Sequence, residues 1–364
     1  MLARLLCILL VSAVPPAAAA RTPDVLTADE WRLALEERGV ERPHLRSPIE
    51  PDEELRAAVA GIVASVSGTM ASLRRLQAYL FDSREFAYDY YAGRTLNATE
   101  TFVERRGNCV SFTNLFIAMA RAIDIPVQAA LARIPREIET IGDLVIVNSH
   151  VVAVVPYASG RMVFDFDQNR TAERIQYRII SDLELTAVYL NNLGAERLIA
   201  DDPRGAISYF TDASRLAPDF AASHRNLGVA FQRTGDLAAA IDATLLSLYY
   251  EPRNISTRNN LLGLFAASTR AAPAEDAPAG GPRLGSLLRA GDQALSTGQP
   301  GNAWRFYRKA LRIDENEPDV YVALARVLLF RGRLRGAVRN LRTAIHLDRG
   351  HPEARRLLRG LDRE

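Results

Sequence analysis

The sequence contains little cysteine, almost no lysine and none of the common nucleotide or zinc-enzyme motifs. Arginine supplies all but one of the 45 basic residues, and the formal net charge of +2 argues against a dedicated nucleic-acid binder. The phosphate-binding loop G-x-x-x-x-G-K-[ST], the dinucleotide fingerprint G-x-G-x-x-G and the zinc motif H-E-x-x-H are all absent. After the N-terminal residues, no apolar run is long enough to cross a bilayer. We therefore expect no nucleic-acid partner, no membrane span and no cofactor.

The N-terminus has the three parts of a secretory signal peptide. Arg4 supplies a short positive region, residues 5–14 form an apolar core, and a run of alanines ends at Ala20, the simplest cleavage point. A lipoprotein signal would place a cysteine at the cleavage point, and the sequence has none there. We therefore expect a soluble exported protein, either periplasmic or secreted.

Cysteine is limited to Cys7 and Cys109, and the first of these is removed with the signal peptide. Exported proteins usually pair their cysteines, so a single remaining thiol indicates either an intermolecular bridge or a reactive sulfur. The alternative is an inert side chain that packs as a small hydrophobic residue. The residues around Cys109 provide the evidence that distinguishes these interpretations.

Hydrophobic periodicity predicts a helical N-terminal segment followed by a mixed domain. Thr27 and Glu30 have the spacing of a capping box, and apolar residues then recur at helical intervals. Residues 109–123 are apolar almost all round, as in a buried helix. Residues 144–155 are rich in β-branched side chains and residues 162–167 alternate, so we predict strands there. A helix followed by such strands indicates an α+β domain.

The C-terminal half repeats at a fixed interval. Asn-Leu-Gly occurs at 192–194 and again at 226–228, and Gly298 matches Gly332 at the same interval. A period of about 34 residues, with a small residue at the helix contact and proline at the boundary, is the tetratricopeptide signature, so we predict an all-α repeat region. The Ala-, Pro- and Gly-rich stretch 266–283 is predicted to be a flexible linker between two pairs of repeats.

The predicted organisation is a signal peptide, a helical segment, an α+β domain and two repeat pairs joined by the linker. In chain order these parts are residues 1–20, 21–82, 83–180, 185–265, 266–283 and 284–364. The linker leaves the last pair free to move relative to the rest. That pair is rich in arginine, which indicates either a solvated face or a patch for an anionic ligand.

The residues before Cys109 favour a reactive sulfur. Gly107 and Asn108 predict a turn, which places Cys109 in the first turn of a helix. Backbone N–H groups and the helix dipole at that position stabilise a thiolate, and they can hold a developing oxyanion. A nucleophile of this kind also needs a base.

His150 is the candidate base, because it lies in a strand of apolar residues where a histidine has no packing advantage. Asp165 and Asp167 lie on the following strand, and their spacing places both side chains on one face, where either can orient the imidazole. The alternatives are a core histidine with satisfied hydrogen bonds and carboxylates that are only strand-edge charges. A Cys/His/Asp metal site is a further alternative, although the three residues lack close spacing.

The segment RRGNCVSFTNLFIAMARAIDIPV resembles the nucleophile segment of the transglutaminase-like superfamily, with its G-x-C turn, buried helix and short exit to Ile-Pro. TLNATETF, SHVVAVV and RMVFDFD resemble the lead-in, the histidine strand and the aspartate strand of that family, in the family's order. The resemblance implies a papain-like core. It assigns Cys109 as the nucleophile and His150 as the general base. It assigns Asp165, whose separation from the histidine suits the family's usual interval, as the orienting carboxylate, with Asp167 as the alternative.

We therefore expect an exported cysteine acyl-transfer enzyme, which is either a peptide or amide hydrolase or a transferase. Its substrate is expected to be a protein or peptide that binds the groove of the repeats. Hydrolysis is favoured, because water is abundant and the sequence has no sign of an amine site. The alternative is a non-catalytic, repeat-based scaffold with an inactive transglutaminase-like module, since Val152, Phe166 and Asp167 replace residues that the family often has there.

Overall fold

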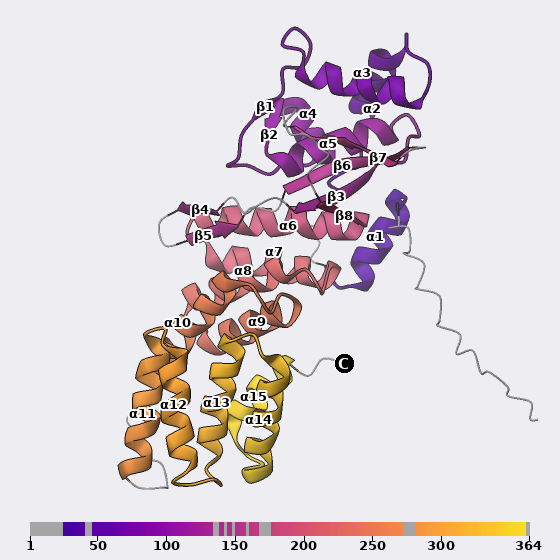
Figure 1. The fold of residues 1–364 in the computed structure, drawn as a ribbon. Coiled ribbons are helices and arrows are strands. Elements are labelled where there is room, and N and C mark those ends of the chain that lie inside the picture. Colours follow the sequence, from indigo (N-terminus) through magenta and orange to yellow (C-terminus); the bar gives the residue numbers. More distant parts are fainter. Residues whose placement is uncertain are drawn as a thin grey trace, which may run out of the picture.

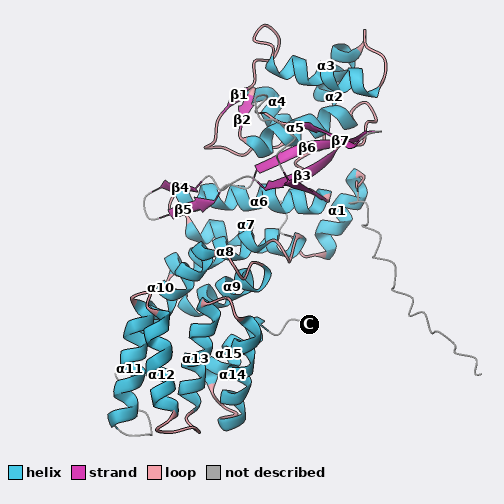
Figure 2. Cartoon of the chain, viewed as in Figure 1, coloured by secondary structure: helices cyan, strands magenta, loops and turns pink. Residues whose placement is uncertain are grey.

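The computed structural model describes residues 25–40, 46–133, 138–141, 144–147, 150–157, 160–166, 176–271 and 282–361. The predicted signal peptide, residues 1–20, lies outside them. Figure 1 shows an elongated chain with a small sheet and its helices at one end and a column of helices at the other. After the last strand, the described residues contain only helices and loops (Figure 2). None of the described helices is both long and apolar enough to cross a membrane.

The N-terminal part of the described chain contains five helices and eight strands. The helices are α1 (Ala28–Glu37), α2 (Glu53–Val63), α3 (Thr69–Phe81), α4 (Ala98–Glu104) and α5 (Cys109–Arg121). The strands are β1 (Asp89–Tyr90), β2 (Arg106–Gly107), β3 (Gln128–Arg133), β4 (Ile138–Ile141), β5 (Leu144–Val147), β6 (His150–Tyr157), β7 (Gly160–Phe164) and β8 (Gln176–Ile180).

Ten helices follow. They are α6 (Asp182–Ile199), α7 (Pro203–Leu216), α8 (Ala221–Thr234), α9 (Leu237–Tyr250), α10 (Ile255–Ala271), α11 (Pro282–Ser296), α12 (Pro300–Leu311), α13 (Pro318–Phe330), α14 (Leu334–Leu347) and α15 (Pro352–Leu361). The predicted division into an α+β domain and an all-α repeat region is confirmed.

Four strands form one antiparallel sheet in the order β7-β6-β3-β8. Its strands β6 and β7 overlap the predicted strands of residues 144–155 and 162–167, and Ala153 pairs with Phe164 between them. Strand β7 ends at Phe164, so Asp165 lies just after the strand and not on it as predicted. The sequence pattern does not predict β3, because its residues QAALAR include no β-branched side chain. This strand is paired with β6 on one side and β8 on the other, so pairing in the folded sheet outweighs its weak local preference.

Helix α5 is the central helix of the domain, as the sequence predicts. Every residue from Val110 to Ala120 is buried. The helix packs on the sheet: Thr113 Oγ1 donates to the Val151 carbonyl at 3.0 Å, and the rings of Phe116 and Phe164 stack at 4.5 Å. These contacts hold α5 against β6, whose first residue is His150, the predicted base.

The N-terminal helices pack on two different parts of the molecule. The predicted capping box of Thr27 and Glu30 is present at the start of α1. This helix lies against α6, where Trp31 Nε1 donates to Thr186 Oγ1 at 3.0 Å. Helices α2 and α3 instead pack against α5. The helical segment therefore connects the α+β domain with the first repeat.

The repeat helices pack in pairs through small residues at equivalent positions. Gly194 faces Phe210, and one repeat later Gly228 faces Thr244. In both pairs a Cβ on the glycine would lie within 3 Å of the facing side chain. Glycine is therefore needed for the two helices to approach this closely. The repeat period read from the sequence therefore corresponds to the period of helix contacts.

The predicted linker of residues 266–283 needs a correction. Helix α10 continues through Ala271 and α11 begins at Pro282, so both ends of the stretch are helical. Residues 272–281 lie outside the described residues. The alanines near the end of α10 are good helix formers, and they extend the helix beyond the predicted boundary.

The last repeat pair shares a core with the first, which corrects the expectation that it moves freely. Leu245 and Leu248 of α9 belong to the same buried cluster as Leu357 and Leu361 of α15. Burial of apolar side chains between these helices favours a fixed arrangement. Helix α15 contacts α9 and α13 contacts α10, and Figure 1 shows α9 and α10 above these last helices.

We expect Gly291→Ala to destabilise the protein, because a Cβ at this position of α11 would lie 2.2 Å from the Tyr307 ring. Tyr307 is fully buried, and its hydroxyl donates to Asp292 at 2.8 Å, so the ring cannot easily move away. The expected cost is about 1–3 kcal/mol in the free energy of unfolding, measured in urea. The matched control is Gly263→Ala in α10, which has open space around it and is expected to gain about 0.5–1 kcal/mol. Equal stability of the two variants would contradict the prediction.

Candidate active site

Cys109 is the first residue of α5, and the two residues before it set its position. Asn108 is the N-cap, and its Oδ1 accepts hydrogen bonds from the backbone N–H groups of Val110 and Ser111 at 3.0 and 3.1 Å. Gly107 has a φ of +154°, and a Cβ there would lie 2.4 Å from Ser111 Cβ. The turn therefore requires glycine, and it places the half-buried Cys109 side chain at the helix N-terminus.

The three residues predicted for the site lie together. His150 hydrogen-bonds through Nε2 to Asp165 Oδ2 at 2.7 Å, and both side chains are less than one-tenth exposed. The side chain of Cys109 also hydrogen-bonds to His150. Because Nε2 faces the carboxylate, Nδ1 is the ring nitrogen left for the sulfur. Asp167, the alternative carboxylate, lies outside the described residues.

The surroundings of His150 favour its protonated form. Burial is the largest single effect and lowers the pKa of His150, but the hydrogen bonds and negative charges of Asp165 and Cys109 together raise this pKa to about 9. The Asp165 carboxylate and the Cys109 sulfur therefore flank the ring, and both favour the imidazolium at neutral pH. A ring that is protonated in this way is a proton donor beside the sulfur.

Tyr88 supports the turn in front of Cys109. Its hydroxyl donates to the Asn108 carbonyl at 3.0 Å, and its ring contacts Phe112 edge-on at 5.3 Å. Burial, followed by the charge of Cys109, raises the pKa of Tyr88. The phenol therefore remains a neutral hydrogen-bond donor beside the site.

Aromatic side chains lie next to His150. The ring of Phe166 meets the imidazole at 5.4 Å and stacks on Tyr90 at 4.2 Å. Tyr90 is 47% exposed, and the neighbouring Tyr91 is 44% exposed under the guanidinium of Arg106. Exposed aromatic surface beside the base is suited to contact a bound substrate. Sequence reasoning misses the place of Phe166, because an aromatic residue after a strand carries no signal of its own.

Hydrogen bonds connect the functional groups of this site. Within the described ranges, no group of three or more His, Cys, Asp or Glu side chains is arranged to hold a metal ion. Cys109, His150 and Asp165 instead form a linear chain of hydrogen bonds. Such a chain is the arrangement that activates a nucleophile.

The arginine-rich surface predicted near the C-terminus lies far along the chain from this site. Arg335, Arg339, Arg342 and His346 line one shallow depression. All of its lining residues belong to α14, so the depression is an exposed face of a single helix rather than an enclosed pocket. This arrangement is typical of a solvated face.

We expect the free energy of unfolding to fall as the pH rises from about 6.5 to about 9, because His150 binds its proton more tightly when folded. Below this range the ring is protonated in both states, and above it the ring is neutral in both, so the effect is confined to the range. The slope from this one group is at most about 1.4 kcal/mol per pH unit. Urea unfolding at several pH values measures it.

The control for this pH dependence is His150→Gln, which keeps a polar side chain but cannot titrate. Its unfolding free energy should change less between pH 6.5 and 9 than that of the unsubstituted chain. Parallel pH curves for the two proteins would contradict the raised pKa of His150.

Family models match both parts of the chain. Residues 56–165 match the model of the transglutaminase-like superfamily, a range that contains Cys109, His150 and Asp165. Residues 193–254 and 294–361 match models of the tetratricopeptide repeat. A comparison with curated proteins finds no match.

Three solved structures show weak similarity. The protein TTC0263, described as a thermophilic TPR protein of Thermus thermophilus, is 20% identical, with 48% of this chain and 98% of that chain covered and a TM-score of 0.25. The Pseudomonas aeruginosa pilF structure is also 20% identical, with coverages of 48% and 88% and a TM-score of 0.24. The Cut9-Hcn1 hetero-tetramer of the APC/C is 14% identical, with coverages of 93% and 67% and a TM-score of 0.22. These TM-scores are too low to support any inference about this chain.

The family models and the architecture agree on the two parts of the protein. The α+β domain contains the sheet and the central helix that carries Cys109, and the paired helices that follow have the repeat period. The chain is thus a transglutaminase-like superfamily domain followed by tetratricopeptide repeats.

Proposed function

We propose that the protein is an exported, cysteine-dependent acyl-transfer enzyme that acts on a peptide or amide bond. One observation carries the proposal: His150 is hydrogen-bonded to Asp165 on one side and to Cys109 on the other. In this arrangement the carboxylate orients the ring, and the ring exchanges a proton with the sulfur. The buried position of the His150–Asp165 pair strengthens both interactions.

In the proposed reaction, the Cys109 sulfur attacks the substrate carbonyl carbon and forms a tetrahedral intermediate. The backbone N–H of Cys109 and the positive end of the α5 dipole stabilise the oxyanion. The His150 imidazolium then gives its proton to the leaving amine, the carbon–nitrogen bond breaks, and an acyl-enzyme remains.

The acyl-enzyme is resolved by a second nucleophile. The neutral His150 ring takes a proton from water, the hydroxide attacks the thioester, and the acid leaves as Cys109 returns to its starting form. An amine in place of water would complete a transfer reaction by the same steps. We favour hydrolysis, since water is always available in an exported protein's surroundings.

The repeats are proposed to bind the protein or peptide on which the enzyme acts. Tetratricopeptide repeats stack into extended surfaces that suit such partners. An envelope protein or a cell-wall peptide is the class of substrate that an exported enzyme of this kind would meet. The exposed ring of Tyr90, which stacks on Phe166 beside His150, would contact the substrate near the reacting bond.

The test is to trap the acyl-enzyme. The full chain is incubated with p-nitrophenyl acetate as a small acyl donor and separately with a cell-envelope extract, and the mass of the peptide that contains Cys109 is measured. The proposal expects a burst of nitrophenol and an acyl adduct on Cys109. A protein that gives neither, although Cys109 reacts with iodoacetamide, would refute it.

The second candidate is a scaffold in which the transglutaminase-like module is inactive. It is favoured by the positions at which the sequence departs from the family, Val152, Phe166 and Asp167, and Phe166 lies against the proposed base. Cys109→Ser separates the two functions, because binding of a partner by the repeats survives this substitution and a covalent function does not.

A further inference from the structure

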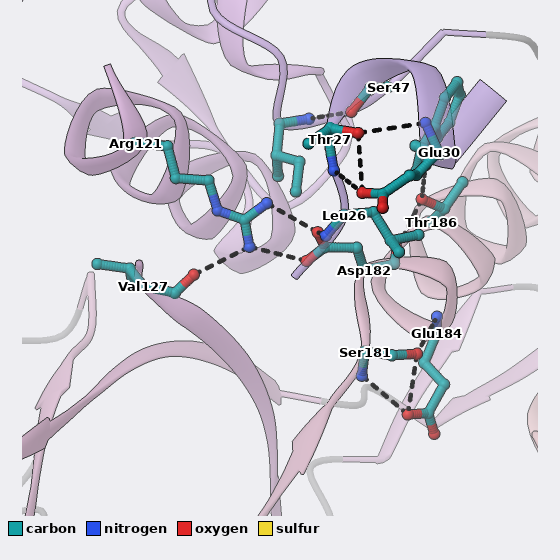
Figure 3. A network of polar contacts seen from close by, with 12 residues as sticks. Leu26, Thr27, Glu30, Ser47, Arg121, Val127, Ser181, Asp182, Glu184 and Thr186 are labelled. Atoms are coloured by element: carbon teal, nitrogen blue, oxygen red, sulfur yellow. Dashed lines mark hydrogen bonds and ion pairs between the residues drawn. The ribbon is translucent and has the colours of Figure 1, made fainter. Parts of the chain in front are cut away.

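Helix α6, the first helix of the repeats, is bonded to the end of the helix that carries the nucleophile. At the C-terminal end of α5, Arg121 donates to both carboxylate oxygens of Asp182 at 2.8 Å (Figure 3). The same guanidinium donates to the Val127 carbonyl at 3.0 Å, just before β3. Asp182 is 5% exposed, so this ion pair is largely shielded from water.

The segment before α1 completes the partners of this carboxylate. The Leu26 N–H donates to Asp182 Oδ2 at 2.9 Å (Figure 3). Trp31 in α1 donates to Thr186, one turn further along α6. Helix α6 is therefore held between α1 and the α+β domain. Breaking such a buried pair by removing one partner is costly, so the start of α6 is fixed relative to α5.

A second connection runs from α6 to the N-terminal end of α5. The Glu196 carboxylate accepts a hydrogen bond from the Thr95 N–H. Thr95 Oγ1 accepts a hydrogen bond from Asn108 Nδ2 at 2.7 Å. Thr95 and Asn108 are only 3% and 7% exposed, so water cannot readily replace either bond.

Asn108 is the point at which this connection reaches the nucleophile. Its Nδ2 is held by Thr95, and its Oδ1 caps the N–H groups of Val110 and Ser111. The orientation of one amide group therefore fixes both the contact with Thr95 and the first turn of α5. Cys109 lies between the cap and the capped residues, so its position follows the orientation of Asn108.

We infer that Glu196 of the first repeat is a positioning residue for Cys109, acting through Thr95 and Asn108. The inference rests on the proposed function, in which Cys109 is the nucleophile. The first repeat is then part of the scaffold of the site as well as a place where a partner binds. The family models treat the two parts separately, since they end at residue 165 and resume at residue 193.

The test compares Glu196→Ala with Glu184→Ala in the full chain. Glu184 is the matched control, since it lies on the same helix and accepts a backbone N–H from Ser181 at 2.9 Å, but belongs to the cap of α6 itself. The rate of iodoacetamide alkylation at Cys109 is measured at pH 7 by peptide mass. We expect Glu196→Ala to lower this rate about 5- to 10-fold, the size of a lost helix cap, and Glu184→Ala to leave it unchanged.

Thr95 provides a second set of variants that keeps the carboxylate in place. Thr95→Val removes the hydroxyl that Asn108 needs and is expected to lower the alkylation rate by a similar factor. Thr95→Ser restores the hydroxyl and should recover most of the rate. If the substitutions only loosened the fold, the serine and valine variants would lose alkylation rate to a similar extent. Recovery of the rate in Thr95→Ser alone therefore identifies a positioning role for the hydroxyl.

Two results would overturn the inference. One is an alkylation rate at Cys109 in Glu196→Ala that equals that of the unsubstituted chain, whatever Thr95→Val does. The other is an equal loss of rate in Glu196→Ala and Glu184→Ala. Alkylation needs no substrate, so this test does not depend on catalysis. If the proposed function fails, no acyl adduct forms on Cys109 with p-nitrophenyl acetate, but the order of the alkylation rates among the variants is kept.

Discussion

Cys109→Ser is expected to abolish acyl transfer while the protein remains folded. The oxygen of serine is a far weaker nucleophile than an ionised sulfur, and the His150–Asp165 pair is arranged here for a thiol. We expect the rate of acylation by p-nitrophenyl acetate to fall by about 1,000-fold or more, and the acyl adduct to disappear from the peptide's mass. The fall should appear in the burst phase, which reports the acylation step itself.

The control for this variant is its folding. Cys109 is only partly buried and serine has a similar size, so the midpoint of thermal unfolding should change by a few degrees at most. Binding of a partner by the repeats should also be unchanged. If the serine variant keeps the acylation rate of the unsubstituted chain, another group is acylated and the proposed mechanism is wrong.

His150→Gln is expected to have the next largest effect, a loss of about 100- to 10,000-fold in acylation rate. Glutamine keeps a polar side chain but cannot carry the proton that the leaving group needs. It also removes the positive ring beside the Cys109 sulfur, so alkylation by iodoacetamide at neutral pH should fall as well. Rates measured from pH 5 to pH 10 should lose the titration that belongs to the ring.

Asp165→Asn provides the matched control for the histidine. The amide can still accept a hydrogen bond from Nε2, but it removes the negative charge that raises the pKa of His150. Its loss of rate should be smaller than that of His150→Gln, and its pH profile should shift toward lower pH. An Asp165→Asn profile identical to that of the unsubstituted chain would assign the orienting role to another carboxylate.

The helices and the repeat region could be predicted from the sequence more completely than the sheet. The capping box at Thr27, the buried helix after Asn108 and the fixed interval of the repeats are regular patterns along the chain, and all three are present in the structure. The strand β3 is not predicted, because alanine-rich segments fit helices equally well. Its place between β6 and β8 depends on partners distant in the sequence.

The candidate site shows the same division. Cys109 and His150 stand out in the sequence because each is unusual in its surroundings, and the structure places their side chains in contact. Period-2 spacing left Asp165 and Asp167 as equal partners, and the family resemblance favoured Asp165. The hydrogen bond at 2.7 Å places Asp165 on the ring. Thr95 and Glu196 carry no sequence signal, since an exposed-looking threonine and a glutamate on a polar helix face are ordinary.

The arrangement of the last repeats also depends on the tertiary structure. Composition predicts a linker between the two pairs, and the apolar faces of the last helices predict only that they are buried somewhere. Their burial against α9 and α10 is decided by complementary surfaces, which a linear pattern does not describe.

By itself, the sequence determined the class of each part: a mixed domain with one conspicuous sulfur at a helix start, followed by helices that repeat at a fixed interval. These properties are encoded by periodicity, caps and turns, which can be read along the chain without knowing its fold. The tertiary structure alone decided that His150 meets both Cys109 and Asp165, and that α6 is bonded to both ends of α5. These contacts join residues up to 101 positions apart, and their energies depend on burial and geometry that only the folded chain creates.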